Sequence, residues 1–182
     1  DNAWSKAGHL IAEEQFVINE FENTYDELEP GEELVVADTY GSLRIFTEDI
    51  NIRFERRERN QLYSVKVGGE ELLAAPVRLN FWRALTDNDR GSRAGSRLGW
   101  RDAGNAPGIS NNTKFSIEGY KILENGKKVI VTCGATVCTQ PESKAIMIYT
   151  ITSNGIEVDM QFRAGEGLPE IPEVSMLFEL PG

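Results

Sequence analysis

The chain alternates apolar and polar residues over several short stretches, and no other feature limits its possible folds as strongly. Residues 43–47 and 50–54 both repeat with a period of two, which predicts strands with one buried and one exposed face. Residues 62–67 continue this pattern and are followed by Gly68-Gly69, a pair typical of a tight hairpin turn. We therefore predict an all-β fold, an antiparallel twisted β-sandwich.

The second half of the chain carries the same kind of pattern. Apolar stretches rich in branched residues predict strands at residues 129–133, 146–151 and 156–162. The last two strands flank Asn154-Gly155, a pair that favours a tight turn with positive φ angles. Helical periodicity is poor over most of the chain, and only residues 100–104 suggest a short helical turn.

Charge and composition exclude several classes of partner. The formal net charge of −10 over 182 residues argues against nucleic acid or an anionic membrane, because binding to phosphates requires clustered Lys and Arg. No apolar run approaches the roughly 20 residues that a membrane-spanning helix needs. The single histidine, His9, does not favour a zinc site and has no neighbouring Ser or Cys motif to activate. We expect this chain to bind no metal and no cofactor.

The two cysteines, Cys133 and Cys138, lie five positions apart. If one continuous strand contains both, this odd spacing places the two thiols on opposite faces of the sheet. A disulfide between them would then require a break in the strand. Two unlinked and mostly buried cysteines fit a reducing, cytoplasmic setting.

The N-terminal part of the chain differs from the rest. Residues 1–24 are strand-like and rich in aromatic and branched side chains, and residues 22–33 are strongly acidic with a turn signal at Pro30-Gly31. Like charges in a block repel and stay solvated, so we interpret the acidic segment as a linker. We expect one unit at residues 1–30 and a second at residues 31–182.

The run from Asn80 to Gly91 combines two large aromatic residues, two arginines and two aspartates. Aromatic faces, guanidinium groups and carboxylates are the groups with which proteins bind polar, ring-shaped ligands. The candidate sugar-binding or substrate-proximal residues are Trp82, Arg83, Asp87, Asn88, Asp89, Arg90, Gly91 and, just beyond the run, Arg93. The aromatic pair also allows a plainer interpretation, in which Phe81 and Trp82 anchor the segment to the core, one ring inward and one outward.

The two aspartates do not form a convincing catalytic pair. Asp87 and Asp89 could approach the spacing of about 5–10 Å between carboxyl groups that glycoside hydrolysis requires. However, the residue types from Thr86 to Gly91 are typical of a turn in which side chains form hydrogen bonds to the backbone. Arg90 beside them would hold both carboxylates ionised, whereas a general acid must carry a proton. Calcium is not indicated either, because the remaining ligands of an EF-hand loop are absent. We predict no catalytic residue in this chain.

Three segments of the chain resemble a known family. Residues 80–91, read as N-F-W-R-A-L-T-D-N-D-R-G, resemble the N-F-W-R-A-P-T-D-N-D-x-G signature of large multidomain bacterial β-galactosidases, with Leu85 in place of the proline. Residues 4–16 resemble the closing strands of the immunoglobulin-like domain of these enzymes, and residues 168–181 resemble their L-P-x-x-P segment. The three matches occur in the order and at about the spacing of the family, and together they cover nearly the whole chain.

The resemblance implies a specific place for the chain in such an enzyme. Residues 1–30 would be the tail of the immunoglobulin-like domain with an acidic linker, and residues 31–182 the first half of the last domain, a sandwich of the galactose-mutarotase type. Half a sandwich would leave apolar sheet surface and strand edges uncovered. The Gly-rich residues 91–99 would form a loop that reaches toward the active-site mouth, with Gly91 as its hinge and Arg93 or Arg97 as its polar contact.

The resemblance also implies a function for the parent enzyme. The parent would hydrolyse terminal β-D-galactosides with retention through two glutamates of a (β/α)8 barrel, helped by magnesium, often as a tetramer. This chain would support the barrel, contact the remaining domains and be inactive alone. Two other functions remain open, namely a stand-alone carbohydrate-binding module with Trp82 in its site and a purely structural interaction domain.

Overall fold

The computed structural model describes residues 28–57, 60–84, 86–92, 113–168 and 171–182. Several predictions lie outside these residues: the immunoglobulin-like segment at residues 1–27 with His9, the loop from Arg93 to residue 99, and the helical turn at residues 100–104. The outcomes below concern the described part of the chain.

The first sheet has five strands that follow one another in the sequence. They are β1 (Val35–Asp38), β2 (Ser42–Phe46), β3 (Ile50–Glu55), β4 (Leu62–Val67) and β5 (Glu70–Glu71), each antiparallel to its neighbour in the order β1-β2-β3-β4-β5. The predicted hairpin between β4 and β5 is confirmed. Gly68 and Gly69 have φ angles of 57° and 87°, a left-handed conformation that glycine adopts at no steric cost.

The second sheet consists of four long strands. They are β7 (Lys114–Leu123), β8 (Lys128–Val137), β9 (Ser143–Thr152) and β10 (Gly155–Arg163), antiparallel in the order β10-β9-β8-β7, with the short 3-10 helix η1 (Glu124–Gly126) between β7 and β8. The strands predicted from residues 129–133, 146–151 and 156–162 are thereby confirmed and extended.

The turn between β9 and β10 is as short as predicted, but its backbone is different. Thr152 pairs directly with Gly155, and neither Asn154 nor Gly155 has a positive φ angle. Side chains stabilise the turn instead. The Asn154 N–H donates to the Thr152 hydroxyl at 3.2 Å, and the Asn154 side-chain amide donates to the Glu29 carbonyl at 3.0 Å.

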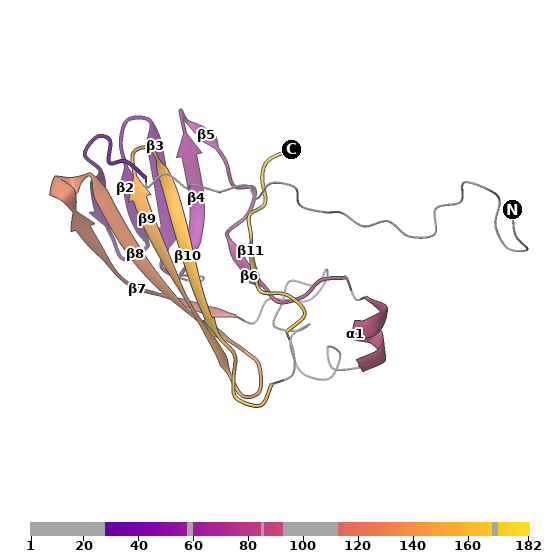
Figure 1. Ribbon diagram of the computed structural model, residues 1–182. Helices are drawn as coiled ribbons and strands as arrows, with labels where there is room; N and C mark the ends of the chain where they lie inside the picture. Colours follow the sequence, from indigo (N-terminus) through magenta and orange to yellow (C-terminus); the bar gives the residue numbers. More distant parts are fainter. Residues whose placement is uncertain (1–27, 58–59, 85, 93–112, 169–170) are drawn as a thin grey trace, which may run out of the picture.

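The two sheets pack face to face around one hydrophobic core (Figure 1). The alternation seen in the sequence determines which residues enter it: Leu43 and Ile45 of β2 are fully buried, while Arg44 between them points to the opposite face. Phe54 of β3 meets Tyr149 of β9 across the two sheets, edge to face, with ring centres 5.1 Å apart. The predicted all-β sandwich is therefore confirmed.

A third, smaller sheet lies beside the sandwich. It pairs β6 (Arg78–Asn80) with β11 (Ser175–Leu177) in antiparallel register. The helix α1 (Asp87–Ser92) follows β6 and lies away from the two large sheets (Figure 1).

The core is less completely covered at strand β10, an edge of its sheet. The inward-facing residues of β9, such as Met147 and Tyr149, are fully buried, whereas Val158 and Met160 of β10 are only half-buried. No helix among the described residues has the length and apolar character needed to cross a membrane.

The prediction for the cysteines is half correct. Cys133 lies in the middle of β8 and is buried, and no disulfide joins it to Cys138. Cys138, however, is exposed and not buried. It lies just past the end of β8 at Val137, and the alternation of the strand continues there, with Val137 and Thr139 buried on either side of it.

Candidate functional site

The centre of the candidate site is the buried side chain of Asn80 at the end of β6. Its Nδ2 donates to the Trp82 carbonyl at 2.9 Å, to Oε1 of Glu173 at 3.1 Å and to the Ser175 hydroxyl at 3.3 Å. Its Oδ1 accepts from the Trp82 N–H at 3.4 Å. A single amide therefore shapes the backbone of its own segment and joins that segment to the C-terminal part of the chain.

Arg83 makes a second connection between the same two segments. Its Nε donates to the Pro172 carbonyl at 2.8 Å, and its Nη1 donates to the Ala84 carbonyl at 3.3 Å. At least part of this guanidinium is therefore used inside the chain, where it holds residues 80–84 against residues 172–175.

The two aromatic residues of the run differ in their surroundings. Phe81 is fully buried in the core and lies 5.1 Å from Phe162 between ring centres. Trp82 is half-buried and packs against the edge of that core. This arrangement fits the anchoring interpretation for Phe81, and it leaves part of the indole of Trp82 accessible to solvent.

The segment that follows is a helix, and the prediction of an Asx-rich turn is wrong there. Asp87–Ser92 forms α1, so Gly91 belongs to the last turn of a helix. The physical reason lies in the same residue types: Asp and Asn favour the first turn of a helix as well as tight turns, because their side chains accept hydrogen bonds from exposed N–H groups and carboxylates stabilise the helix N-terminus.

The structure brings only some of the candidate residues together. Trp82 and Arg83 lie in the hydrogen-bonded unit around Asn80, whereas Asp87, Asn88 and Gly91 are exposed on α1. The backbones of Asp89 and Arg90 belong to α1, and their side chains, like all of Arg93, lie outside the described part of the chain.

Sequence reasoning missed the partners of this site, namely Pro172, Glu173 and Ser175. The segment that contains them was recognised, since residues 168–181 carry part of the family resemblance. What the sequence did not reveal is the contact, because no pattern within either segment specifies the other. The Ser175 hydroxyl donates to Glu173 Oε1 at 2.5 Å. The carboxylate of Glu173 therefore accepts hydrogen bonds from both Asn80 and Ser175.

Further contacts extend this unit along the chain. Arg78 forms an ion pair with Glu179, and the Ala74 N–H donates to the Glu179 carbonyl at 2.8 Å. The C-terminal segment thus runs beside residues 74–83 over most of its described length (Figure 1).

The described residues offer little for covalent or metal chemistry. Burial raises the pKa of the Cys133 thiol to about 12, and the nearby Glu118 carboxylate adds to this effect, so the thiolate needed for nucleophilic attack does not form near neutral pH. Within the described ranges, no group of three or more His, Cys, Asp or Glu side chains is arranged to hold a metal ion.

Comparison with known proteins gives a consistent result. The family model described as β-galactosidase small chain matches residues 47–182. A β-galactosidase of Priestia megaterium is 28% identical over 182 residues, covering 99% of this chain and 17% of that protein. A β-galactosidase of Lactobacillus delbrueckii subsp. bulgaricus is 31% identical over 183 residues, covering 100% of this chain and 17% of that protein.

A third relative is itself a separate subunit. The β-galactosidase small subunit of Latilactobacillus sakei is 26% identical over 168 residues, covering 80% of this chain and 53% of the subunit. The chain therefore spans about a sixth of the length of the first two relatives and about half of the small subunit.

Proposed function

The chain belongs to the β-galactosidase small-chain family, and from this membership we propose that it is a non-catalytic accessory β-sandwich segment of a retaining β-galactosidase. The relatives that carry this name are glycoside hydrolases, and the resemblance noted in the sequence is confirmed at the level of the family. The whole enzyme would hydrolyse terminal β-D-galactosides, and this segment would support its barrel.

One observation carries the proposal. The two segments that resemble the family, residues 80–91 and 168–181, meet in one hydrogen-bonded unit through Asn80 and Arg83. Such a unit is a rigid base for whatever follows it, and α1 follows it directly. We infer that the unit positions α1, and the residues after it, toward the substrate entrance formed by other domains.

The proposal assigns no chemical step to this chain. Magnesium is implied for the whole enzyme by resemblance, but the described residues provide no ligand set that fits it. Its ligands and the two catalytic glutamates would then belong to other parts of the enzyme. A cytoplasmic setting is proposed as well, supported by two cysteines that are not joined in a disulfide.

An assay of the purified chain tests the first part of the proposal. We expect no hydrolysis of o-nitrophenyl β-D-galactoside by the 182-residue chain. Turnover by this chain alone would overturn the accessory role.

The positioning role requires a test in a complete β-galactosidase that contains this segment. Asp87→Ala and Asn88→Ala, both at exposed positions of α1, should raise KM for the galactoside. Asp87→Ala should also lower the melting temperature slightly, because it removes a carboxylate at the N-terminus of the helix. Asp159→Ala, at a carboxylate that is also exposed, on β10, is the matched control and should change neither quantity. Equal kinetics in all three variants would refute a role at the substrate entrance.

The half-buried position of Trp82 is the one observation that keeps a carbohydrate-binding module as a second candidate. Titration of the chain with galactose or lactose, followed by tryptophan fluorescence, separates the two functions. A saturable response that Trp82→Phe abolishes would favour the binding module, whereas no response would favour the accessory segment.

A further inference from the structure

A hollow of about 470 Å³ lies on the first sheet, lined by Ala37, Thr39, Ser42, Arg44, Asn51 and Arg53. These residues belong to β1, β2, β3 and the turn between β1 and β2, and the strand residues alternate with the buried core positions. The hollow therefore opens on the outer face of the sheet, away from the sandwich core. Its volume falls within the range of about 300–1,000 Å³ that is usual for small-molecule sites.

Two arginines face each other in this hollow. Arg44 and Arg53 are direct cross-strand partners in the β2–β3 pair, an arrangement in which like charges destabilise a sheet. The side chain of Arg53 has no hydrogen bond or ion pair to any residue in the described ranges. In a chain with a net charge of −10, these two side chains form a local concentration of positive charge, and no carboxylate of the described residues lines the hollow with them.

Arg44 is held in position by its neighbours. Its Nε donates to the Asn51 side-chain oxygen at 2.9 Å, and its guanidinium carbon lies 4.1 Å from the centre of the Phe46 ring. These contacts use one N–H and one face of the guanidinium. The two terminal nitrogens have no partner among the described residues, so they remain available as a fork of donors.

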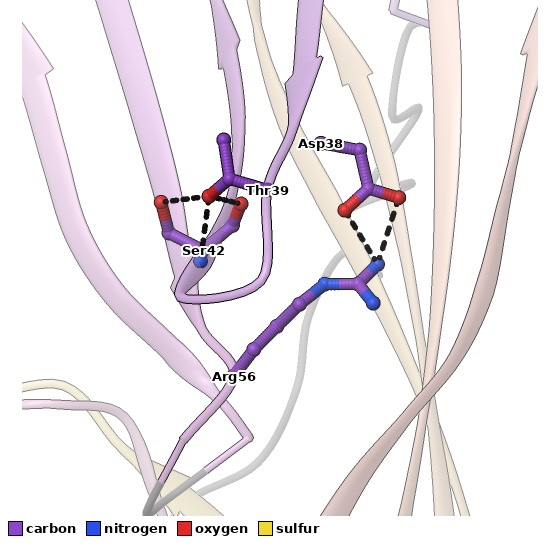
Figure 2. Close-up of polar contacts among 4 residues, drawn as sticks. All are labelled: Asp38, Thr39, Ser42 and Arg56. Carbon is purple, nitrogen blue, oxygen red and sulfur yellow. Dashed lines mark hydrogen bonds and ion pairs between the residues drawn. The ribbon is translucent and has the colours of Figure 1, made fainter.

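The acidic side chains nearest along the strands are already engaged. Figure 2 shows Asp38 in an ion pair with Arg56, at 3.2 Å, beside the turn in which Thr39 and Ser42 bond to each other. Glu55, two residues after Arg53, accepts a hydrogen bond from the Arg57 N–H at 2.5 Å. Neither carboxylate lines the hollow.

We propose that this hollow is a binding site for an oxyanion, a carboxylate or phosphate group, which Arg44 and Arg53 would bind jointly. A bound oxyanion would relieve the repulsion between the two guanidinium groups and accept hydrogen bonds from their N–H groups. Thr39 and Ser42 line the same hollow. The site shares no residue with the unit around Asn80, so it is separate from the accessory role proposed above.

The site can be tested on the ¹⁵N-labelled chain by nuclear magnetic resonance. Citrate and inorganic phosphate are titrated at constant ionic strength, with sodium chloride as compensation, because general screening also shifts signals. We expect saturable shifts of the Arg44 and Arg53 Nε–H signals. Arg53→Gln should weaken citrate binding about tenfold or more, the usual effect of losing a charged hydrogen bond.

A matched variant serves as the control. Arg163→Gln removes one arginine that is also exposed, from β10 on the other sheet, and should leave the dissociation constant unchanged. The proposed site would be overturned by signal shifts that do not saturate. Shifts that are the same in the unmodified chain, Arg53→Gln and Arg163→Gln would overturn it as well. Since Arg53 is exposed and makes no contact that the fold depends on, its replacement should leave the spectrum well dispersed.

A second titration distinguishes two possible ligands, a carboxylate side chain of a protein and a free anion. N-acetyl-L-glutamate amide stands for a carboxylate side chain of another protein segment, and citrate stands for a free multivalent anion. Saturation by the glutamate derivative as tightly as by citrate would support the site and identify a protein carboxylate as its ligand. Saturation by citrate and phosphate alone would support a free anion, and no saturation by any of them would exclude the site.

Discussion

The side-chain amide of Asn80 donates to the Glu173 carboxylate at 3.1 Å across 93 residues of sequence. This contact joins the aromatic and arginine-rich segment to the C-terminal segment, and the neighbouring bond to Ser175 repeats the connection. Both bonds involve side chains that are at least half-buried, where an unsatisfied polar group is costly. The unit around Asn80 is thus a structural element that the rest of the site depends on.

Replacing Asn80 with alanine should destabilise the chain. The variant loses every side-chain bond of the amide and leaves Glu173 without one donor, so we expect the free energy of unfolding to fall by about 2–3 kcal/mol. Urea unfolding followed by circular dichroism measures the change. Asn154→Ala, which loses one exposed bond to Glu29, is the control and should cost less than about 1 kcal/mol. Equal stability of the two variants would contradict the proposed importance of Asn80.

The edge-to-face pair of Phe54 and Tyr149 should couple the two sheets energetically. Phe54→Leu and Tyr149→Leu each change the shape of a buried side chain and should cost about 1–3 kcal/mol. The double variant should cost less than the sum by about 0.5–1.5 kcal/mol, the coupling typical of an aromatic pair. Phe178→Leu, at a side chain that is 45% exposed, should change stability by no more than about 0.5 kcal/mol. Strict additivity would refute the coupling.

Glu71 should make stability depend on pH in the acidic range. Burial raises the pKa of its carboxyl, but hydrogen bonds from the Ser64 hydroxyl and from the Val65 and Leu73 N–H groups outweigh burial and lower the pKa below the ordinary value of 4.5. A lowered pKa in the folded state gives stability that is complete above pH 4.5 and is lost as the pH falls through the folded-state value.

The variant Glu71→Gln isolates this contribution. At pH 7 it should be less stable than the parent chain by about 1 kcal/mol, a value reduced because the side chain is partly exposed. The difference should shrink as the pH falls below 4.5. Glu70→Gln, an exposed neighbour in the same short strand, is the control. A difference that stays constant from pH 7 to pH 3 would show that the charge of Glu71 does not matter.

The two cysteines should differ sharply in reactivity. Cys138 is exposed, whereas Cys133 is buried with a pKa raised to about 12. At pH 8 the folded chain should therefore react rapidly with one equivalent of Ellman's reagent, and a second equivalent should react only on unfolding. Cys138→Ser should abolish the fast phase, and Cys133→Ala should leave it intact. Two fast thiols in the folded chain would be inconsistent with the position of Cys133 in β8.

The local sequence pattern was enough to predict strands whose pairing partner comes next in the sequence. β2 and β3 alternate cleanly and are joined by a short turn, and β4 alternates as well, so each of these strands can be inferred from neighbouring residues. The register of β3 with β4 is less regular, because it shifts between Arg53 and Phe54. Strand β7 was not predicted, although Phe115 and Ile117 alternate in it. A bulge between Ile117 and Gly119 shifts the register, and this shift hides the period of two from a simple count.

The candidate site was harder to predict for a physical reason. Strands β6 and β11 have only three residues each, and they exist as strands because they pair with each other. No local pattern specifies such a pairing, so Glu173 and Ser175 could not be inferred as partners of Asn80. The helix α1 was missed because Asp and Asn favour both a tight turn and the start of a helix. The binding roles of Trp82, Asp87 and the residues around them remain predictions.

The pairing of β6 with β11 also determines when this region can form during synthesis. Asn80 and Ser175 are 95 residues apart, so at translation rates of 5–20 residues per second β6 waits roughly 5–20 s for its partner. The hairpins of the first sheet are complete long before then, because their contacts are local. The segment from Asn80 to Arg83 is therefore among the last parts of the described chain to reach its final backbone conformation. A nascent chain arrested before residue 175 would expose Trp82 and Arg83 without the C-terminal residues that hold them in place.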